Sequence, residues 1–208
     1  MSRFYFRRYT TLPILLDVLS NKRLTLLDPK NWDDKNDSYF IELYKNRKNL
    51  KSVLALCFAE VPDTYHHWKV FAGNDSGVCI VFYKDILLNY FGEGFRKQKV
   101  DYPFRDNMEF EIDDFENLPF VKRYAFRDER EFRIIYEDKR REIATKDVDI
   151  PLKSIEHILI NPWMPKSVYS SVKKVIRNIE GCRNIKILRT TMVEDERWKR
   201  IGRKIATR

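Results

Sequence analysis

The strongest constraint on the fold is a continuous apolar run of strand length at residues 52–59. No charged residue interrupts this run, so both sides of an extended chain would be free of charge. Strands of this kind are typical of the middle of a sheet that is covered on both faces. We therefore expect a central strand here, with layers of structure on either side of it.

A second constraint is the stretch at residues 126–136, where a turn leads into a strand with alternating charged and apolar side chains. The alternation predicts a strand with one buried face. Glu129, Glu131 and Arg133 follow one another at intervals of two, so an extended chain would carry all three on one face. Carboxylates beside a cation at the start of a strand suit a catalytic edge. A surface ladder of salt bridges is the alternative that the pattern leaves open.

The rest of the chain carries further strand and helix signals, without an internal repeat or a low-complexity linker. Strands are expected at residues 3–9, 24–27, 78–83, 97–101, 155–160 and 185–188, and helices at residues 12–19, 39–49, 62–71, 85–90, 168–179 and beyond 194. The acidic segment Asn107–Leu118 has helical character. Residues 155–188 form a β-α-β unit, whose strands would pair in parallel. We expect one α+β domain over residues 1–208, with a mixed, mainly antiparallel, split central sheet, flanking helices and this C-terminal β-α-β unit.

Composition and charge narrow the class of protein. No apolar run approaches the roughly 20 residues that span a bilayer, and the N-terminal residues lack the apolar core of a signal peptide. The three cysteines, Cys57, Cys79 and Cys182, form no CxxC motif, which fits a reducing compartment. We expect a cytoplasmic protein with no membrane partner.

The net charge is +9, with a pI near 9.4, which favours a polyanionic partner such as DNA or RNA. Ordinary solubilisation by lysine and arginine is the alternative. The last predicted helix would carry Trp198, Ile201 and Ile205 on one side and basic residues on the rest. We expect it to be docked through its apolar side; a nucleic-acid arm is the other interpretation.

Several kinds of catalytic site find little support. His66 and His67 would point about 100° apart on a helix and could not easily share a zinc ion. The chain has no GxSxG elbow and no GxxxxGK phosphate loop. No metal site is predicted in the leading interpretation. A Mg²⁺-dependent nuclease that uses Asp37, Glu129 and Glu131 remains an alternative, because two-metal sites use such carboxylates.

Three features in chain order suit another chemistry. Arg7 or Arg8 on the first strand could clamp a pyrophosphate. The segment Cys57–Ala59 ends the central strand, and Glu129 and Glu131 open a later one. A carboxylate there could bind a ribose hydroxyl and stabilise the oxocarbenium-like charge that develops as nicotinamide leaves. This is the chemistry of ADP-ribosyl transfer from NAD⁺. A surface ion pair is the alternative role for Arg8.

Several sequence blocks together resemble a bacterial family described as domain of unknown function 2971 (DUF2971). The blocks are Phe6–Tyr9, Leu26–Asp37, Leu56–Phe58, His67–Ala72 with Gly77–Ile80, and Glu129–Ile135. Their order is similar to the Arg–Ser–Glu arrangement of ADP-ribosyltransferases. The resemblance implies an ADP-ribosyltransferase-type fold, and some relatives are encoded near phage-defence or toxin systems, which implies an antitoxin or another protein partner.

Carried over by position, the resemblance places Arg8 on phosphate, Phe58 and Ala59 at the strand that supports the pocket, and Glu131 as the catalytic acid. It implies that Glu129 orients the acceptor nucleophile. The sequence has Cys57–Ala59 where Ser-Thr-Ser is usual.

The aromatic side chains expected on the nicotinamide side are Tyr9, His67, Trp68 and Phe71. The leading hypothesis is an NAD⁺-dependent ADP-ribosyltransferase that modifies nucleic acid or protein. A non-catalytic nucleic-acid-binding protein is the third hypothesis, after the nuclease.

Overall fold

The computed structural model describes residues 4–72, 75–104 and 114–207. The strands are β1 (Tyr5–Thr11), β2 (Arg23–Leu27), β3 (Ser52–Ala59), β4 (Gly77–Tyr83), β5 (Phe95–Lys99), β6 (Glu131–Asp138), β7 (Thr145–Asp149), β8 (Ile155–Ile160) and β9 (Lys186–Arg189). The α-helices are α1 (Leu12–Asn21), α2 (Lys35–Arg47), α3 (Tyr65–Phe71), α4 (Lys84–Leu88), α6 (Lys166–Asn178) and α7 (Glu196–Ala206). The 3₁₀ helices are η1 (Pro29–Asn31), η3 (Phe115–Phe120), η4 (Tyr124–Glu129) and η5 (Leu152–Ser154).

The strands form one sheet in the order β5-β6-β3-β1-β4-β8-β9, and β2 joins β7 to β3 outside this path. Within the described ranges the strands pair antiparallel except β8 and β9, which are parallel and connected through α6. The predicted α+β class, the mainly antiparallel sheet and the C-terminal β-α-β unit are confirmed.

The sheet is split between β1 and β3. Strand β1 pairs with β4 along its whole length, but it meets β3 at a single position, Arg7 opposite Ala59. Strand β3 instead pairs with β6 along its whole length. Two ladders therefore diverge from one point of contact.

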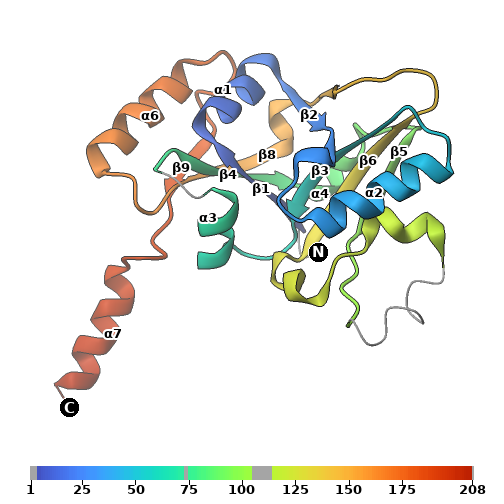
Figure 1. Cartoon of the computed structure of the whole chain (residues 1–208). Helices are drawn as coiled ribbons and strands as arrows, with labels where there is room; N and C mark the ends of the chain where they lie inside the picture. The colour runs from blue at the N-terminus through green and yellow to red at the C-terminus, as the bar shows by residue number, and fades with distance from the viewer. Residues whose placement is uncertain (1–3, 73–74, 105–113, 208) are drawn as a thin grey trace.

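Apolar side chains cover both faces of the sheet. On one face, Leu54, Leu56 and Phe58 of β3 belong to a core cluster that also receives α1, α4 and α6. On the other face, Val53 and Ala55 pack with α2, and a separate cluster packs α3 against β4 and β8. Figure 1 shows α1 and α6 on one side of the sheet and α2 and α3 on the other. The predicted central strand at residues 52–59 is thus buried on both faces.

Some local predictions were wrong. Strand β6 has buried side chains on both faces from Glu131 to Ile135, where one buried face was expected. Its charged residues form ion pairs inside the protein, so the face that carries them can be buried. The alternating pattern of the sequence does not reveal such pairing. Strand β7 was not predicted, because its sequence, TKDVD, has few residues that favour strands. Of the acidic segment at residues 107–118, residues 107–113 lie outside the described part and residues from 115 form η3.

Helix α7 does not dock on the described part of the chain. None of its residues is buried, and Figure 1 shows it extending away from the sheet. The expectation of a docked helix was therefore wrong. Among the described residues no helix is long and apolar enough to cross a membrane.

Candidate active site

A cavity of about 450 Å³ opens where β1 and β3 diverge. Strand β1 contributes Arg7, Arg8 and Tyr9, and strand β3 contributes residues 55 and 57–59. The remaining walls come from the end of α3, the segment before and into α2, and residues 122–133. Ligand pockets of drug-sized molecules fall in the same volume range. The split of the sheet therefore creates a concave site from elements far apart in the sequence.

Arg133 organises one wall of this cavity. Its guanidinium is fully buried and donates to Glu131 through Nε (2.8 Å) and Nη2 (3.1 Å). It also donates to both carboxylate oxygens of Asp37 on α2, at 2.8 and 2.7 Å, and to the carbonyl oxygen of Pro119 at 2.7 Å. The indole ring of Trp32 covers the guanidinium at 4.7 Å. All five N–H donors of the Arg133 guanidinium are therefore hydrogen-bonded inside the protein.

Lys122 completes the network from the opposite side. Its Nζ lies 2.5 Å from Glu129, 3.5 Å from Glu131 and 3.7 Å from Asp37. Three buried carboxylates thus share two buried cations, Lys122 and Arg133. We call these five residues the acidic wall. It is not the surface ladder of salt bridges that the sequence left open, because every member is buried or nearly so.

The two glutamates converge by a different route from the one expected. Glu129 ends the 3₁₀ helix η4, and Arg130 after it adopts a left-handed conformation, with φ 45° and ψ 50°. Only Glu131 begins strand β6. The side chains are brought together by this turn, not by the alternation of an extended chain. A non-glycine residue in the left-handed region is uncommon, and its position between two buried acids shows how tightly the turn is fixed.

The two glutamates differ in protonation. Burial would raise the pKa of Glu131, but the charges and hydrogen bonds of Arg133, with help from Lys122, outweigh it and hold the pKa at about 2. Burial raises the pKa of Glu129 to about 7, since Lys122 offsets the cost of desolvation only in part. Near neutral pH, Glu131 is therefore a fixed anion, while Glu129 can exchange a proton.

The opposite wall, formed by β1, carries cations without acidic partners. Arg8 is half-buried and donates through Nη1 to the carbonyl oxygen of Cys57 at 3.3 Å, across the gap between the strands. Its Nε is buried without a hydrogen-bond partner. Among the described residues, neither Arg8 nor its neighbour Arg7 lies within ion-pair distance of a carboxylate. Alternation along β1 directs the two side chains to opposite faces of the strand, but both residues line the cavity, and we call Arg7 and Arg8 the arginine wall.

Aromatic side chains line the space between the walls only in part as predicted. Tyr9 and Phe71 line the cavity, and so do Trp32 and Phe126, which the sequence did not single out as cofactor ligands. Trp68 does not line it: its ring is fully buried in the core cluster under α3. Its apolar bulk serves packing, so the predicted contact of Trp68 with nicotinamide does not fit the cavity.

His67 also lies behind the cavity surface, and its ring stacks on Tyr9 at 5.2 Å between centroids. Its Nε2 lies 3.1 Å from the carbonyl oxygen of Glu129, and its Nδ1 lies 2.6 Å from the hydroxyl of Thr64. A carbonyl can only accept, so Nε2 carries the proton and Nδ1 accepts from Thr64. Burial lowers the pKa of His67, which keeps the ring neutral. His67, predicted to contact nicotinamide, instead hydrogen-bonds the backbone of Glu129 and helps to hold the turn there.

Cys57 occupies the position at which the resemblance leads one to expect a serine-containing strand end. It pairs with Arg133 across the β3–β6 ladder and lines the cavity. Burial and the nearby charge of Glu131 raise the pKa of the Cys57 thiol well above its ordinary value. It is therefore a neutral thiol and not an activated nucleophile.

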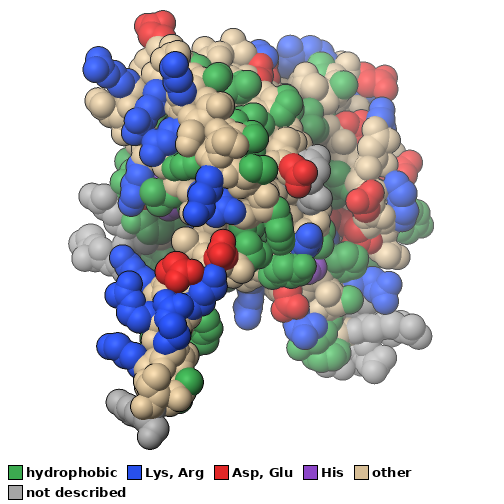
Figure 2. Space-filling model, turned by 90° about the vertical axis from the view of Figure 1, so that its left-hand side faces the viewer, with side chains coloured by type: hydrophobic (Ala, Val, Ile, Leu, Met, Phe, Trp, Pro, Cys, Tyr) green, Lys and Arg blue, Asp and Glu red, His purple; other side chains and the backbone are tan. Residues whose placement is uncertain are grey.

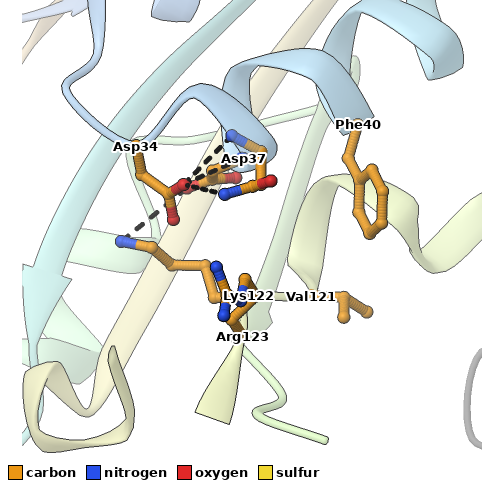
Figure 3. A pocket seen from close by; sticks show the side chains of 7 residues that line it. Asp34, Asp37, Phe40, Val121, Lys122 and Arg123 are labelled. Atoms are coloured by element: carbon orange, nitrogen blue, oxygen red, sulfur yellow. Dashed lines mark hydrogen bonds and ion pairs between the residues drawn. The ribbon is translucent and has the colours of Figure 1, made fainter. Parts of the chain in front are cut away.

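A second, smaller cavity of about 280 Å³ adjoins the acidic wall on its other side. Figure 3 shows Lys122 beside Asp34 and Asp37, with Arg123 next to Lys122 and Phe40 and Val121 farther away. Lys122 and Asp37 line both cavities. The acidic wall is therefore reached from two directions.

The structure thus brings together six of the eight residues that the sequence proposed for the site: Arg8, Tyr9, Phe58, Phe71, Glu129 and Glu131. It places His67 and Trp68 behind them. The main addition is Lys122, which no motif marks, since a single lysine in a basic chain carries no positional signal. Within the described ranges, no group of three or more acidic, histidine or cysteine side chains is arranged to hold a metal ion.

No protein-family model matches the chain, and no curated protein matches it. Among solved structures, the chain is similar to DarT of Thermus sp. 2.9 in complex with ADP-ribosylated single-stranded DNA, at 12% identity and a TM-score of 0.48, over 89% of this chain and 93% of the other. It is also similar to DarT of the same source with NAD⁺, at 10% identity and a TM-score of 0.48, over 91% and 96%. At such identities and TM-scores below 0.5, the likeness by itself establishes neither a shared activity nor a shared site.

Proposed function

We propose that the protein is an ADP-ribosyltransferase that uses NAD⁺ as substrate and modifies nucleic acid. One observation carries the proposal: a single cavity is lined both by arginines without acidic partners and by an ionised, rigidly held glutamate. A diphosphate needs unpaired cations, and a ribosyl cation needs a fixed carboxylate. The likeness to DUF2971 members and a role in phage defence or as a toxin belong to the same proposal.

In this proposal, Arg8 and Arg7 bind the diphosphate of NAD⁺. The buried Nε of Arg8, which lacks a partner, supplies a donor that such a ligand would satisfy. Tyr9, Phe71 and Trp32 provide flat apolar surface beside it. These residues bind and orient the substrate and take no part in proton transfer.

Glu131 acts where charge develops. The glycosidic bond between nicotinamide and the ribose breaks, nicotinamide leaves with the electron pair, and positive charge builds up on the ribose. Arg133 keeps Glu131 ionised and fixes its orientation, so the carboxylate need not reorganise as the charge forms. The acceptor nucleophile then forms the new bond to the ribose carbon, and Glu129, with its pKa of about 7, takes the proton that the acceptor loses.

Nucleic acid is the acceptor that the charge favours. The chain has a net charge of +9, and the segment that carries Glu129 also exposes Arg123, Arg127 and Arg130. Cations close to the site would bind phosphates of the acceptor strand. Protein acceptors remain part of the test.

The test incubates the purified protein with NAD⁺ labelled in its adenylate phosphate and offers single-stranded DNA, duplex DNA, RNA and protein. We expect transfer of the label to a nucleic acid, and Glu131→Gln should lower it by at least about a hundredfold. Glu137→Gln is the matched control, because Glu137 lies on the same strand and is ion-paired, but to Lys48 away from the cavity. No transfer to any acceptor, or equal transfer by Glu131→Gln, would reject the proposal.

The nuclease alternative finds less support from the geometry. It needs Asp37 to bind Mg²⁺ together with the two glutamates, but both oxygens of Asp37 accept hydrogen bonds from Arg133. Among the described residues, no group of three carboxylates is arranged to hold a metal ion. It predicts cleavage that EDTA stops and that NAD⁺ does not affect. Non-catalytic binding of nucleic acid predicts salt-sensitive binding that survives Glu131→Gln, without any transfer of label.

A further inference from the structure

Helix α7 carries a surface that the proposed function does not use. Trp198, Ile201 and Ile205 are 76%, 53% and 64% exposed, which is unusual for three large apolar side chains at one place. Their spacing of three and four residues puts them on one stripe of the helix. The rest of the described chain leaves this stripe uncovered, and Figure 2 shows hydrophobic side chains of this projecting helix in the open beside its basic residues.

The polar side of α7 is strongly basic. Five basic residues stand against one acidic residue in the helix, Glu196. Two of them, Lys199 and Arg203, form ion pairs with Glu196, and Lys199 also reaches Glu194. The other three are Arg197, Arg200 and Lys204, for which the described residues provide no ion pair.

These three cations lie together. At 100° per residue, Arg197, Arg200 and Lys204 share one flank of the helix, next to the apolar stripe, while the ion-paired residues share the far flank. A partner that matches this helix would offer apolar groups to the stripe and anionic groups to the adjacent cations. A phospholipid surface has this layout, with phosphates directly above the acyl chains.

We propose that α7 is an interfacial helix that holds the protein on anionic phospholipid membranes, with the apolar stripe in the bilayer boundary and the free cations on headgroup phosphates. This revises the expectation that no membrane takes part, which concerned spanning segments. Gly202 and Ala206 lie beside the stripe and keep the apolar side shallow, which suits a flat boundary better than a deep protein groove.

Other partners fit the observations less well. Two copies of α7 packed through their stripes would bring two basic surfaces together, and like charges repel. A nucleic acid would satisfy the cations but leave Trp198, Ile201 and Ile205 in water, since phosphates gain nothing from apolar side chains. Both partners are nonetheless outcomes of the test.

The test sediments the full chain with vesicles of phosphatidylcholine alone and with vesicles of equal parts phosphatidylcholine and phosphatidylglycerol. We expect at least about tenfold stronger binding to the anionic vesicles, weakened by salt, with tryptophan emission shifted to shorter wavelengths on binding. Ile201→Ser with Ile205→Ser should lower the affinity at least about tenfold. Val168→Ser with Val175→Ser is the matched control, because these exposed valines lie on α6, and it should bind as the natural chain does.

The charged residues give a second arm. Arg197→Gln, Arg200→Gln and Lys204→Gln together should lower binding to anionic vesicles on the order of a hundredfold, at about fivefold for each cation. Lys199→Gln with Arg203→Gln should have a smaller effect for each residue, since these cations are already paired. The proposal is overturned by failure to bind either vesicle, by vesicle binding that neither variant weakens, by dimers that depend on Ile201 and Ile205, or by loss of DNA binding in the charge variant without loss of vesicle binding.

Discussion

The two walls of the cavity differ in whether their charged groups have partners within the protein. On the acidic wall, three carboxylates and two cations satisfy one another, and Arg133 makes five hydrogen bonds within the protein. On the arginine wall, Arg8 makes one long hydrogen bond to a backbone carbonyl and leaves Nε without a partner. A network in which every hydrogen-bond donor has a partner holds its own geometry. A network with unpaired N–H donors can still bind a ligand. This difference supports a structural role for Arg133 and is the basis of the binding role that we propose for Arg8.

The largest effect should come from opening the acidic wall. Arg133→Gln leaves Asp37 and Glu131 buried without their cation, and we expect a loss of about 3–5 kcal/mol in the free energy of unfolding. Urea denaturation measures it. Arg203→Gln is the control, because Arg203 pairs with Glu196 where both side chains are exposed, and its loss should cost less than about 1 kcal/mol. A loss below that value for Arg133→Gln would show that the wall is not a buried network.

Within the acidic wall, Glu129 should make stability depend on pH. Its pKa is raised by folding, so its contribution is complete below the ordinary pKa of about 4.5 and is lost as pH rises through about 7. We expect Glu129→Gln to remove this decline and to be more stable than the natural chain at pH 8, by on the order of 2 kcal/mol. Unfolding free energies between pH 5 and 8 test it, and parallel curves for the two proteins would contradict the assigned protonation.

Removing a cation from the arginine wall should not lower the free energy of unfolding, in contrast to the acidic wall. Arg8→Gln removes a poorly compensated cation and one long hydrogen bond, so we expect stability to stay the same or rise by up to about 1 kcal/mol. Thermal unfolding in the absence of NAD⁺ measures the effect. A loss comparable with that of Arg133→Gln would mean that Arg8 is part of the scaffold and would remove the contrast between the walls.

The smallest effect is expected where the walls meet β3. Cys57→Ser changes the volume little and gives a better hydrogen-bond donor near Glu131, so unfolding free energy should shift by less than about 1 kcal/mol. Label transfer should stay within a few-fold of the natural chain. A loss of transfer by more than tenfold would assign the thiol a specific role that a hydroxyl cannot fill.

The features predicted from sequence are those with strong local signals. The apolar run at residues 52–59 and the β-α-β unit depend on periodicity over several residues, and both occur as expected. Arg8, Cys57–Ala59 and Glu131, which the sequence grouped by their order, line one cavity because strand pairing brings them together; their roles there remain predictions.

What could not be predicted depends on contacts between distant residues. Asp37 lies 96 positions from Arg133, and Lys122 sits in an irregular segment, so no spacing rule connects them. His67 and Trp68 were placed on the cavity because aromatic residues suit both a pocket and a core, and only burial separates the two. The undocked α7 reflects the same limit: amphipathicity shows that a helix has an apolar side, not what covers it.

The most direct test of the two-wall account is NAD⁺ binding measured by calorimetry in a Glu131→Gln protein, in which turnover is blocked. The account predicts that adding Arg8→Gln lowers the affinity by about 10–100-fold, the range for a hydrogen bond to a charged group, while adding Glu137→Gln leaves it unchanged. Equal affinity with and without Arg8, or no binding of NAD⁺ by the Glu131→Gln protein and the natural chain alike, would contradict it.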